Sequence, residues 1–171
     1  VGRPLDMLFP KEEARQGMEM LRVENLCSPG LLHHVNFTAY AGQILGFSGL
    51  VGAGRTETMR AIFGIDQNKT GDIYVKGKKV AITKPRDAIK NSIAFLTEDR
   101  KREGLILDAS VKDNLNLATI DKDVKGFFLD DKKRTALSKK NIQSYKIKAA
   151  SIDTPVGTLS GGNQQKVIIA K

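Results

Sequence analysis

Residues 49–56 read Gly49-Leu50-Val51-Gly52-Ala53-Gly54-Arg55-Thr56, and this stretch decides the fold. Its spacing fits the phosphate-loop pattern G-x-x-x-x-G-K-[ST], with arginine where lysine is usual. Glycines let the backbone curl until successive N–H groups point at phosphate oxygens, and a following helix adds its positive end. The apolar run 43–48 predicts a buried strand before the loop, and residues 55–63 predict a helix after it. The stretch therefore predicts an α/β nucleotide-binding core.

The side chains of the loop suggest how a nucleotide would be held. Thr56 would offer its hydroxyl to Mg²⁺, and Arg55 would reach the outer phosphates. Arginine is a wide planar fork, whereas lysine is a compact point charge. We therefore expect binding at this loop, while efficient hydrolysis there is doubtful. The alternative is a glycine-rich turn without a ligand.

The composition excludes several classes of protein. Hydrophobic residues make up 40% of the 171 residues and charged residues 27%, as in an ordinary folded domain. No apolar run approaches the roughly 18 residues of a membrane-spanning helix. Cys27 is the single cysteine, which rules out an internal disulfide and fits a reducing cytosol. The net charge is +9, but the cations are spread along the chain and aromatics are only 6%, so a solvated basic surface is favoured and no nucleic-acid partner is expected.

The pattern along the chain predicts four sections. These are a linker from an upstream segment over 1–19, a P-loop α/β core with an antiparallel β layer over 20–99, a helical subdomain over 100–158, and a second motif with the start of a helix over 159–171. Within them we expect strands at 21–26, 35–40 and 93–97, a hairpin at 73–75 and 79–82, and helices at 85–90, 111–117, 130–148 and 164–170. Ser110 and Asp113 resemble a capping box before the helix at 111–117.

The second motif reads Leu159-Ser160-Gly161-Gly162-Asn163-Gln164-Gln165. Two glycines after a serine at the start of a helix form an anion site, because Ser160 donates its hydroxyl and the glycines their unobstructed N–H groups. Taken alone, Ser-Gly-Gly is as often a flexible turn. The two motifs in one chain favour the anion site.

Together the motifs resemble those of the ABC transporter ATPases. Residues 49–57, the run Thr97-Glu98-Asp99-Arg100-Lys101 and residues 159–166 are similar to the tandem ATPases of bacterial ribose, galactose and xylose importers, and specifically to their second nucleotide-binding half. The opening Val1-Gly2-Arg3 with Phe9-Pro10 is similar to the linker between the halves. The resemblance covers essentially the whole chain and implies an incomplete ABC-type nucleotide-binding domain.

The resemblance implies roles for individual residues. Two halves of such an ATPase meet head to tail, so the second motif would contact the γ-phosphate of ATP on the other half. Glu98 stands where most members have glutamine, and could ligate Mg²⁺ as Thr56 would, or couple to the membrane subunit. The catalytic acids and the switch histidine are expected past Lys171, so none lies in the chain and the chain alone is not expected to hydrolyse ATP. The implied nucleotide-binding residues are Gly49, Gly52, Ala53, Gly54, Arg55, Thr56, Glu57, Glu98, Ser160, Gly161, Gly162 and Asn163.

The function implied by the resemblance is ATP binding and hydrolysis that drive monosaccharide import. The cofactors would be ATP and Mg²⁺. The partners would be a second half in the same longer chain, membrane permease subunits and, indirectly, a periplasmic sugar-binding protein, at the cytoplasmic face of the bacterial inner membrane. Two alternatives stay open: a regulatory nucleotide-binding module with little turnover, and a soluble ABC-type ATPase that acts on nucleic acid.

Overall fold

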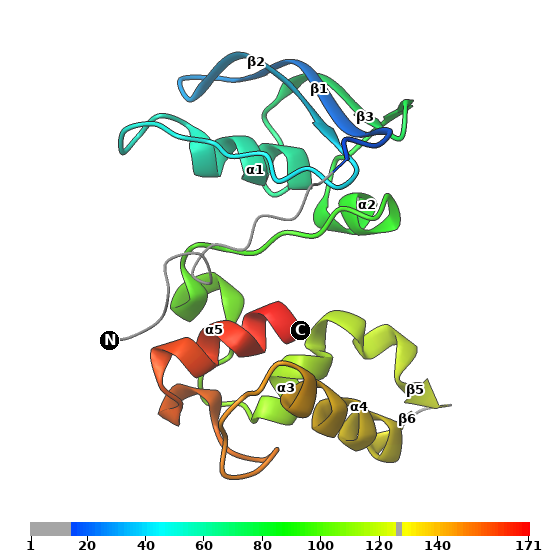
Figure 1. The fold of residues 1–171 in the computed structure, drawn as a ribbon, viewed down its shortest axis with the longest axis vertical. Coiled ribbons are helices and arrows are strands. Elements are labelled where there is room, and N and C mark those ends of the chain that lie inside the picture. The colour runs from blue at the N-terminus through cyan, green and yellow to red at the C-terminus, as the bar shows by residue number, and fades with distance from the viewer. Residues whose placement is uncertain (1–14, 126–127) are drawn as a thin grey trace. The chain divides into compact units, whose positions relative to one another are not determined.

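The computed structural model describes residues 15–125 and 128–171. Most of the predicted linker, including Val1-Gly2-Arg3 and Phe9-Pro10, lies outside the described residues. The chain divides into two compact units between Phe95 and Leu96 (Figure 1), whereas the sequence places a boundary after residue 99. The four-section scheme otherwise stays a prediction.

The first unit is built on an antiparallel sheet with the strand order β2-β1-β3-β4. Its strands are β1 (Glu19–Ser28), β2 (Leu32–Tyr40), β3 (Thr70–Val75) and β4 (Lys78–Val80). The strands expected at 21–26 and 35–40 and the hairpin expected at 73–75 and 79–82 are therefore confirmed. The β3–β4 turn places Lys76 and Gly77 at φ values of 51° and 76°. Two successive left-handed residues form the turn that matches the twist of a two-residue hairpin.

The helices of the first unit complete its core. α1 (Arg55–Phe63) and α2 (Pro85–Lys90) form where the sequence predicts them. Side chains of β1 and β3, among them Val23, Leu26 and Ile73, pack with Ala61 and Ile62 of α1 in one buried cluster. Val23 and Leu26 are three residues apart, and both are buried because the register of β1 shifts between them, where Asn25 has a left-handed φ of 49°. The expected antiparallel layer beside a P-loop helix is confirmed.

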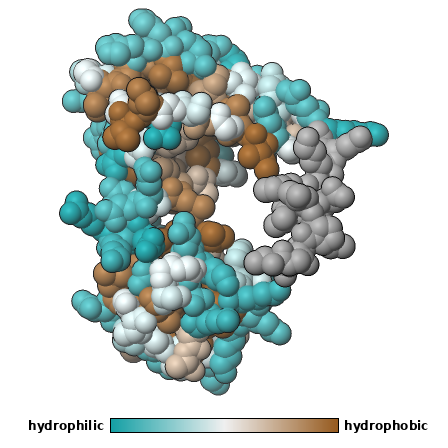
Figure 2. All heavy atoms as spheres, turned by 60° about the vertical axis from the view of Figure 1, so that its left-hand side comes forward, coloured by the Kyte–Doolittle hydropathy of each residue, from teal (hydrophilic) through white to brown (hydrophobic). Residues whose placement is uncertain are grey.

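The two buried strands predicted at 43–48 and 93–97 are wrong. Neither run forms a strand, and Ile44 is 99% exposed. A strand exists only where its N–H and C=O groups pair with a neighbour, and among the described residues neither run has such a partner. Their aromatic residues still pack locally: Phe47 meets Phe37 edge-on at 4.9 Å. Apolar side chains consequently reach the surface (Figure 2).

The second unit is mainly helical. It contains α3 (Val111–Asn116), α4 (Asp131–Ser144) and α5 (Gly161–Ala170), with a π-helical turn (Arg100–Gly104), two 3₁₀ turns (Leu117–Lys122 and Val156–Thr158) and the short strands β5 (Val124–Lys125) and β6 (Phe128–Leu129). Its core joins residues of α3 and α5 with the connecting segments, among them Val111, Leu115, Val156 and Val167. Among the described residues, no helix is long and apolar enough to cross a membrane.

The ends of these helices follow their capping residues. Ser110 Oγ accepts a hydrogen bond from the Asp113 N–H at 3.0 Å, which confirms the cap expected at α3. The helix predicted over 130–148 ends earlier, at Ser144, because Lys146 adopts a left-handed φ of 51°. The helix predicted from residue 164 starts earlier, at Gly161. Both glycines of the second motif therefore belong to the first turn of α5.

Candidate functional site

The phosphate loop curls through alternating backbone handedness. Gly52 and Gly54 have φ values of 84° and 80°, while Ala53 between them does not enter the left-handed region. Such alternation turns successive N–H groups toward one concave side, which is a backbone anion site. α1 begins immediately afterwards at Arg55, so its N-terminus adds partial positive charge. The loop geometry fits a phosphate group, although the predicted strand before it is absent.

Three glycines of the loop are required for different reasons. A Cβ on Gly54 would lie 3.0 Å from Leu32 Cδ2 and 3.3 Å from the Leu31 carbonyl oxygen, so this buried position excludes a side chain. A Cβ on Gly52 would meet nothing within 4 Å, and only its left-handed φ selects glycine there. A Cβ on Gly49 would lie 2.9 Å from Ala53 Cβ, across the mouth of the loop. The loop therefore packs against Leu32 of β2 at Gly54, whereas the space beside Gly52 is empty.

The side chains at the start of α1 differ in their exposure to solvent. Arg55 is exposed, and Thr56 and Glu57 are half-buried. Glu57 occupies the first turn of α1, where a carboxylate stabilises the positive end of the helix. This stabilising role is an alternative to the predicted role of Glu57 in nucleotide binding. Thr58 Oγ1 donates to the Gly54 carbonyl oxygen at 2.7 Å. This bond fixes the loop to the first turn of the helix.

A cavity of about 410 Å³ lies beside the β1–β2 turn. Leu32 lines this cavity and would contact a Cβ on Gly54, so the cavity adjoins the phosphate loop. The sequence shows no aromatic residue for stacking on a base here, and Phe37 contacts Phe47 as a strand residue of β2. The other lining residues are Cys27, Ser28, Pro29, His33, Gln67, Asn68, Lys69 and Thr70.

The second motif forms the N-terminus of α5 in the other unit. Ser160 is the N-cap residue, yet its side chain makes no capping bond among the described residues, and no acid lies in the first turn. A Cβ on Gly162 would meet nothing within 4 Å. Asn163 is engaged within the protein, since its Nδ2 donates to Ser160 Oγ at 3.0 Å and its Oδ1 accepts from the Lys148 N–H at 2.9 Å. The helix end is open to an anion at Ser160 and the two glycines.

Sequence reasoning gave no binding role to Gln164 within this motif or to Arg100 beside it. Gln164 is buried, and its Nε2 donates to the carbonyl oxygens of Val156 at 3.3 Å and Leu159 at 3.1 Å. Its Oε1 accepts from Arg100 Nε at 3.2 Å. The helical spacing was a usable signal for Gln164, because a residue four positions after Ser160 lies on the same face. No sequence signal links Arg100 with a helix that begins about 60 residues later.

Glu98 and Thr56 were predicted together as metal ligands. Thr56 belongs to the first unit and Glu98 to the second, so their joint role in binding Mg²⁺ stays a prediction. Among the described residues, no group of three or more His, Cys, Asp or Glu side chains could hold a metal ion. Mg²⁺ commonly uses one or two protein oxygens together with phosphates and waters, and the Thr56 hydroxyl fits that pattern.

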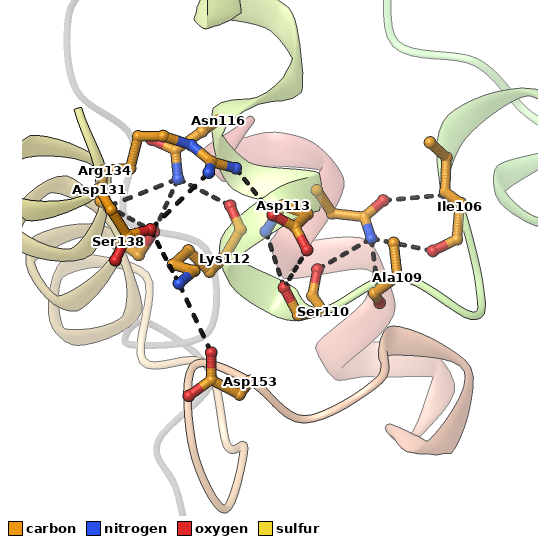
Figure 3. Close-up of polar contacts among 11 residues, drawn as sticks. Ile106, Ala109, Ser110, Lys112, Asp113, Asn116, Asp131, Arg134, Ser138 and Asp153 are labelled. Atoms are coloured by element: carbon orange, nitrogen blue, oxygen red, sulfur yellow. Dashed lines mark hydrogen bonds and ion pairs between the residues drawn. The ribbon is translucent and has the colours of Figure 1, made fainter. Parts of the chain in front are cut away.

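A polar network links α3 and α4 in the second unit (Figure 3). Arg134 of α4 reaches α3, where its Nη2 donates to Asp113 Oδ1 at 2.7 Å. The hydroxyl of Ser110, with the Arg134 charge, keeps the pKa of Asp113 below its usual value. Lys112 bonds Asp131 Oδ1 at 3.1 Å, which raises the pKa of that lysine. The network joins α3 to α4 through charged hydrogen bonds.

Comparisons with known proteins agree with this geometry. A family model described as ABC transporter matches residues 32–171. The chain is similar over all its 171 residues to the ribose import ATP-binding protein RbsA of Lacticaseibacillus paracasei (48% identity, 34% of that protein) and of Streptococcus agalactiae (47%, 35%). It is also similar to a putative ribose/galactose/methyl galactoside import ATP-binding protein of Rhizobium etli (45%, 33%). The chain spans about a third of the length of these curated relatives.

Solved structures show the same fold. A nucleotide-free ATP-binding cassette from an ABC transporter superposes with a TM-score of 0.68 at 21% identity, over 90% of this chain and 64% of that chain. A dimeric cassette in a post-hydrolysis state, bound to ADP and Pi, gives a TM-score of 0.67 at 21% identity, over 88% and 68%. The chain therefore shares the fold of an ATP-binding cassette over 64% and 68% of the length of these two solved chains.

Proposed function

Because the chain belongs to the ABC transporter family, we propose that it is the second nucleotide-binding half of a longer ATPase that drives monosaccharide uptake. The names of its relatives support a sugar as cargo, since they are ribose or galactoside import ATP-binding proteins. Their greater length supports a second half in the same polypeptide. This half would bind ATP with its loop and offer its second motif to the nucleotide of the other half.

One observation carries the proposal: the open N-terminus of α5. Ser160 leaves this helix end without a side-chain cap among the described residues, and Gly161 and Gly162 add no side chains that would cover it. The first N–H groups of a helix have no partner within the helix and attract anions. The γ-phosphate of ATP held by the other half is the anion that this end would contact.

The phosphate loop would serve the opposite nucleotide. Arg55, Thr56 and the N–H groups of 52–54 would hold its phosphates, with the base toward the cavity at Leu32. When bound there, Mg²⁺ would neutralise charge on the phosphates. The guanidinium of Arg55 differs in shape from the usual ammonium, so this site would turn over more slowly than the other. Hydrolysis is proposed for the assembly of two halves and not for this chain alone.

The proposal includes the partners that coupling requires. Transport needs membrane permease subunits, which receive the opening and closing of the two halves, and a sugar-binding protein that acts through them. The ATPase would then lie on the cytoplasmic face of the bacterial inner membrane. The segment around Glu98 and the helices of the second unit are the proposed contacts with the permease.

The test is the steady-state ATPase activity of the full-length protein with its permease. Gly162→Asp places a carboxylate at the open end of α5, where it would repel the γ-phosphate, whereas the matched Gly162→Asn adds the same shape without the charge. We expect Gly162→Asp to lower kcat at least about tenfold more than Gly162→Asn, because two negative charges about 4 Å apart repel each other by about 4 kcal/mol near a protein surface. Arg55→Ala should have a smaller effect. If Arg55→Ala abolishes turnover while Gly162→Asp is silent, the roles of the two motifs are reversed.

A further inference from the structure

Arg100 is a partly buried cation without a carboxylate partner among the described residues. Its Nε donates to Gln164 Oε1 at 3.2 Å, and this is a neutral acceptor. The Gln164 side chain also donates to the carbonyl oxygens of Val156 and Leu159, before α5. These bonds fix the position of the amide that holds the guanidinium. Nearby Arg102, by contrast, is exposed and pairs with Asp99 at 3.7 Å.

The guanidinium lies directly beside the second motif. A Cβ on Gly161 would be 2.9 Å from Arg100 Nη2 and 3.7 Å from Cζ. This position is the N-terminus of α5, which carries partial positive charge. A cation there is unfavourable for the protein alone, and no acid in the first turn offsets it. A bound anion would be attracted by the guanidinium and the helix end together.

We infer that Arg100 binds the terminal phosphate of the nucleotide that the second motif contacts. The inference rests on the proposed function and adds a residue outside the Ser160–Gly161–Gly162 motif to that site. Gln164 would hold Nε, which leaves the Nη atoms for phosphate oxygens in the forked geometry that arginine favours. Gly161 would be glycine partly because a side chain there would displace this guanidinium.

The experiment compares Arg100→Gln, Arg100→Lys and the control Arg102→Gln in the full-length protein with its permease. The steady-state ATPase rate is measured over a range of ATP concentrations, with the unfolding temperature of each variant. Arg100→Gln should lower kcat/KM by about 10- to 100-fold, the loss expected when a hydrogen bond to a charged group is removed. Arg100→Lys keeps the charge, so its kcat/KM should lie above that of Arg100→Gln. We expect the logarithm of kcat/KM to recover by at least about a third of the difference between Arg100→Gln and the wild type. Arg102→Gln should stay within about twofold of the wild type, because its exposed charge is screened.

The outcomes separate this inference from the proposed function. A wild-type protein without ATPase activity would refute the proposed function itself. An active wild type, with Arg100→Gln within twofold of it, would overturn only the role of Arg100. If Arg100→Gln also unfolds at a lower temperature, Arg100→Lys decides: recovery of activity supports the phosphate contact, and no recovery assigns Arg100 a structural role.

Discussion

Asn114→Asp is the perturbation whose effect on stability follows most directly from the structure. Asn114 is 1% exposed and ties the segment before α3 to the helix. Its Oδ1 accepts from the Ile106 N–H at 2.9 Å, and its Nδ2 donates to the carbonyl oxygens of Ile106 at 2.9 Å, Ser110 at 3.1 Å and Ala109 at 3.4 Å. Aspartate has the same shape but turns the donor nitrogen into an oxygen that faces three acceptors.

The size of the loss is set by the donors that disappear. Each intramolecular hydrogen bond contributes about 1 kcal/mol net, so the two bonds from Nδ2 at 3.1 Å or less account for about 2 kcal/mol. Placing a carboxylate against buried carbonyl oxygens adds a desolvation cost, and the carboxyl group would respond by retaining its proton. We expect a loss of about 2–4 kcal/mol in the free energy of unfolding at neutral pH.

The pH dependence follows from the raised pKa of the new carboxyl group at position 114. The unfolded pKa is about 4 and the folded pKa lies higher, so the folded state holds the proton more tightly between them. The free energy of unfolding of Asn114→Asp relative to the wild type therefore falls as pH rises through that window. Protonated, the group can again donate one hydrogen bond to a carbonyl oxygen.

The assay is urea unfolding of the chain followed by circular dichroism at 222 nm, at about pH 5 and about pH 7.5, on either side of neutrality. Asn68→Asp is the control, because it makes the same chemical change at an exposed position. A variant at position 114 that stays within about 0.5 kcal/mol of the wild type at the higher pH would refute the reasoning, because surface substitutions produce losses of that size. So would a loss that does not change between the two pH values.

The remaining predictions concern the phosphate loop and the network of the second unit. Gly54→Ala should destabilise the chain more than Gly52→Ala in urea unfolding, because both add about 1–2 kcal/mol of left-handed strain and only Gly54 also meets Leu32; equal losses would contradict that packing. The Ser110 hydroxyl lowers the pKa of Asp113, so this carboxylate stabilises the fold above its unfolded pKa of about 4 and the contribution disappears as pH falls through the folded pKa. Asp113→Asn should make the unfolding temperature less sensitive to acid, and an unchanged acid profile would argue against this role.

The sequence located the features that depend on neighbouring residues. The curl at Gly52 and Gly54 needs residues tolerant of positive φ, and glycine supplies them in any context. The cap at Ser110 and the start of α1 are equally local, since both involve backbone groups within one turn. The antiparallel hairpin at Lys76 and Gly77 was predictable for the same reason.

The predicted strands at 43–48 and 93–97 show where this reasoning ends. Their apolar side chains suit a buried strand, yet a strand is stabilised by hydrogen bonds to partners that are distant in sequence. Among the described residues these partners do not occur, and neither run pairs in a sheet. Apolar side chains therefore predict that a segment tends to be buried, but they do not by themselves predict that it pairs as a strand.

The sequence by itself determined the family, the two glycine-rich motifs and most helix and strand positions, because these depend on short patterns of residue type. Only the tertiary structure decided which side chains surround the motifs. It brought Arg100 to Gly161, Leu32 to Gly54, and Gln164 to the carbonyl groups before α5. Contacts between residues far apart in the chain follow from packing, and packing is settled only when the elements meet.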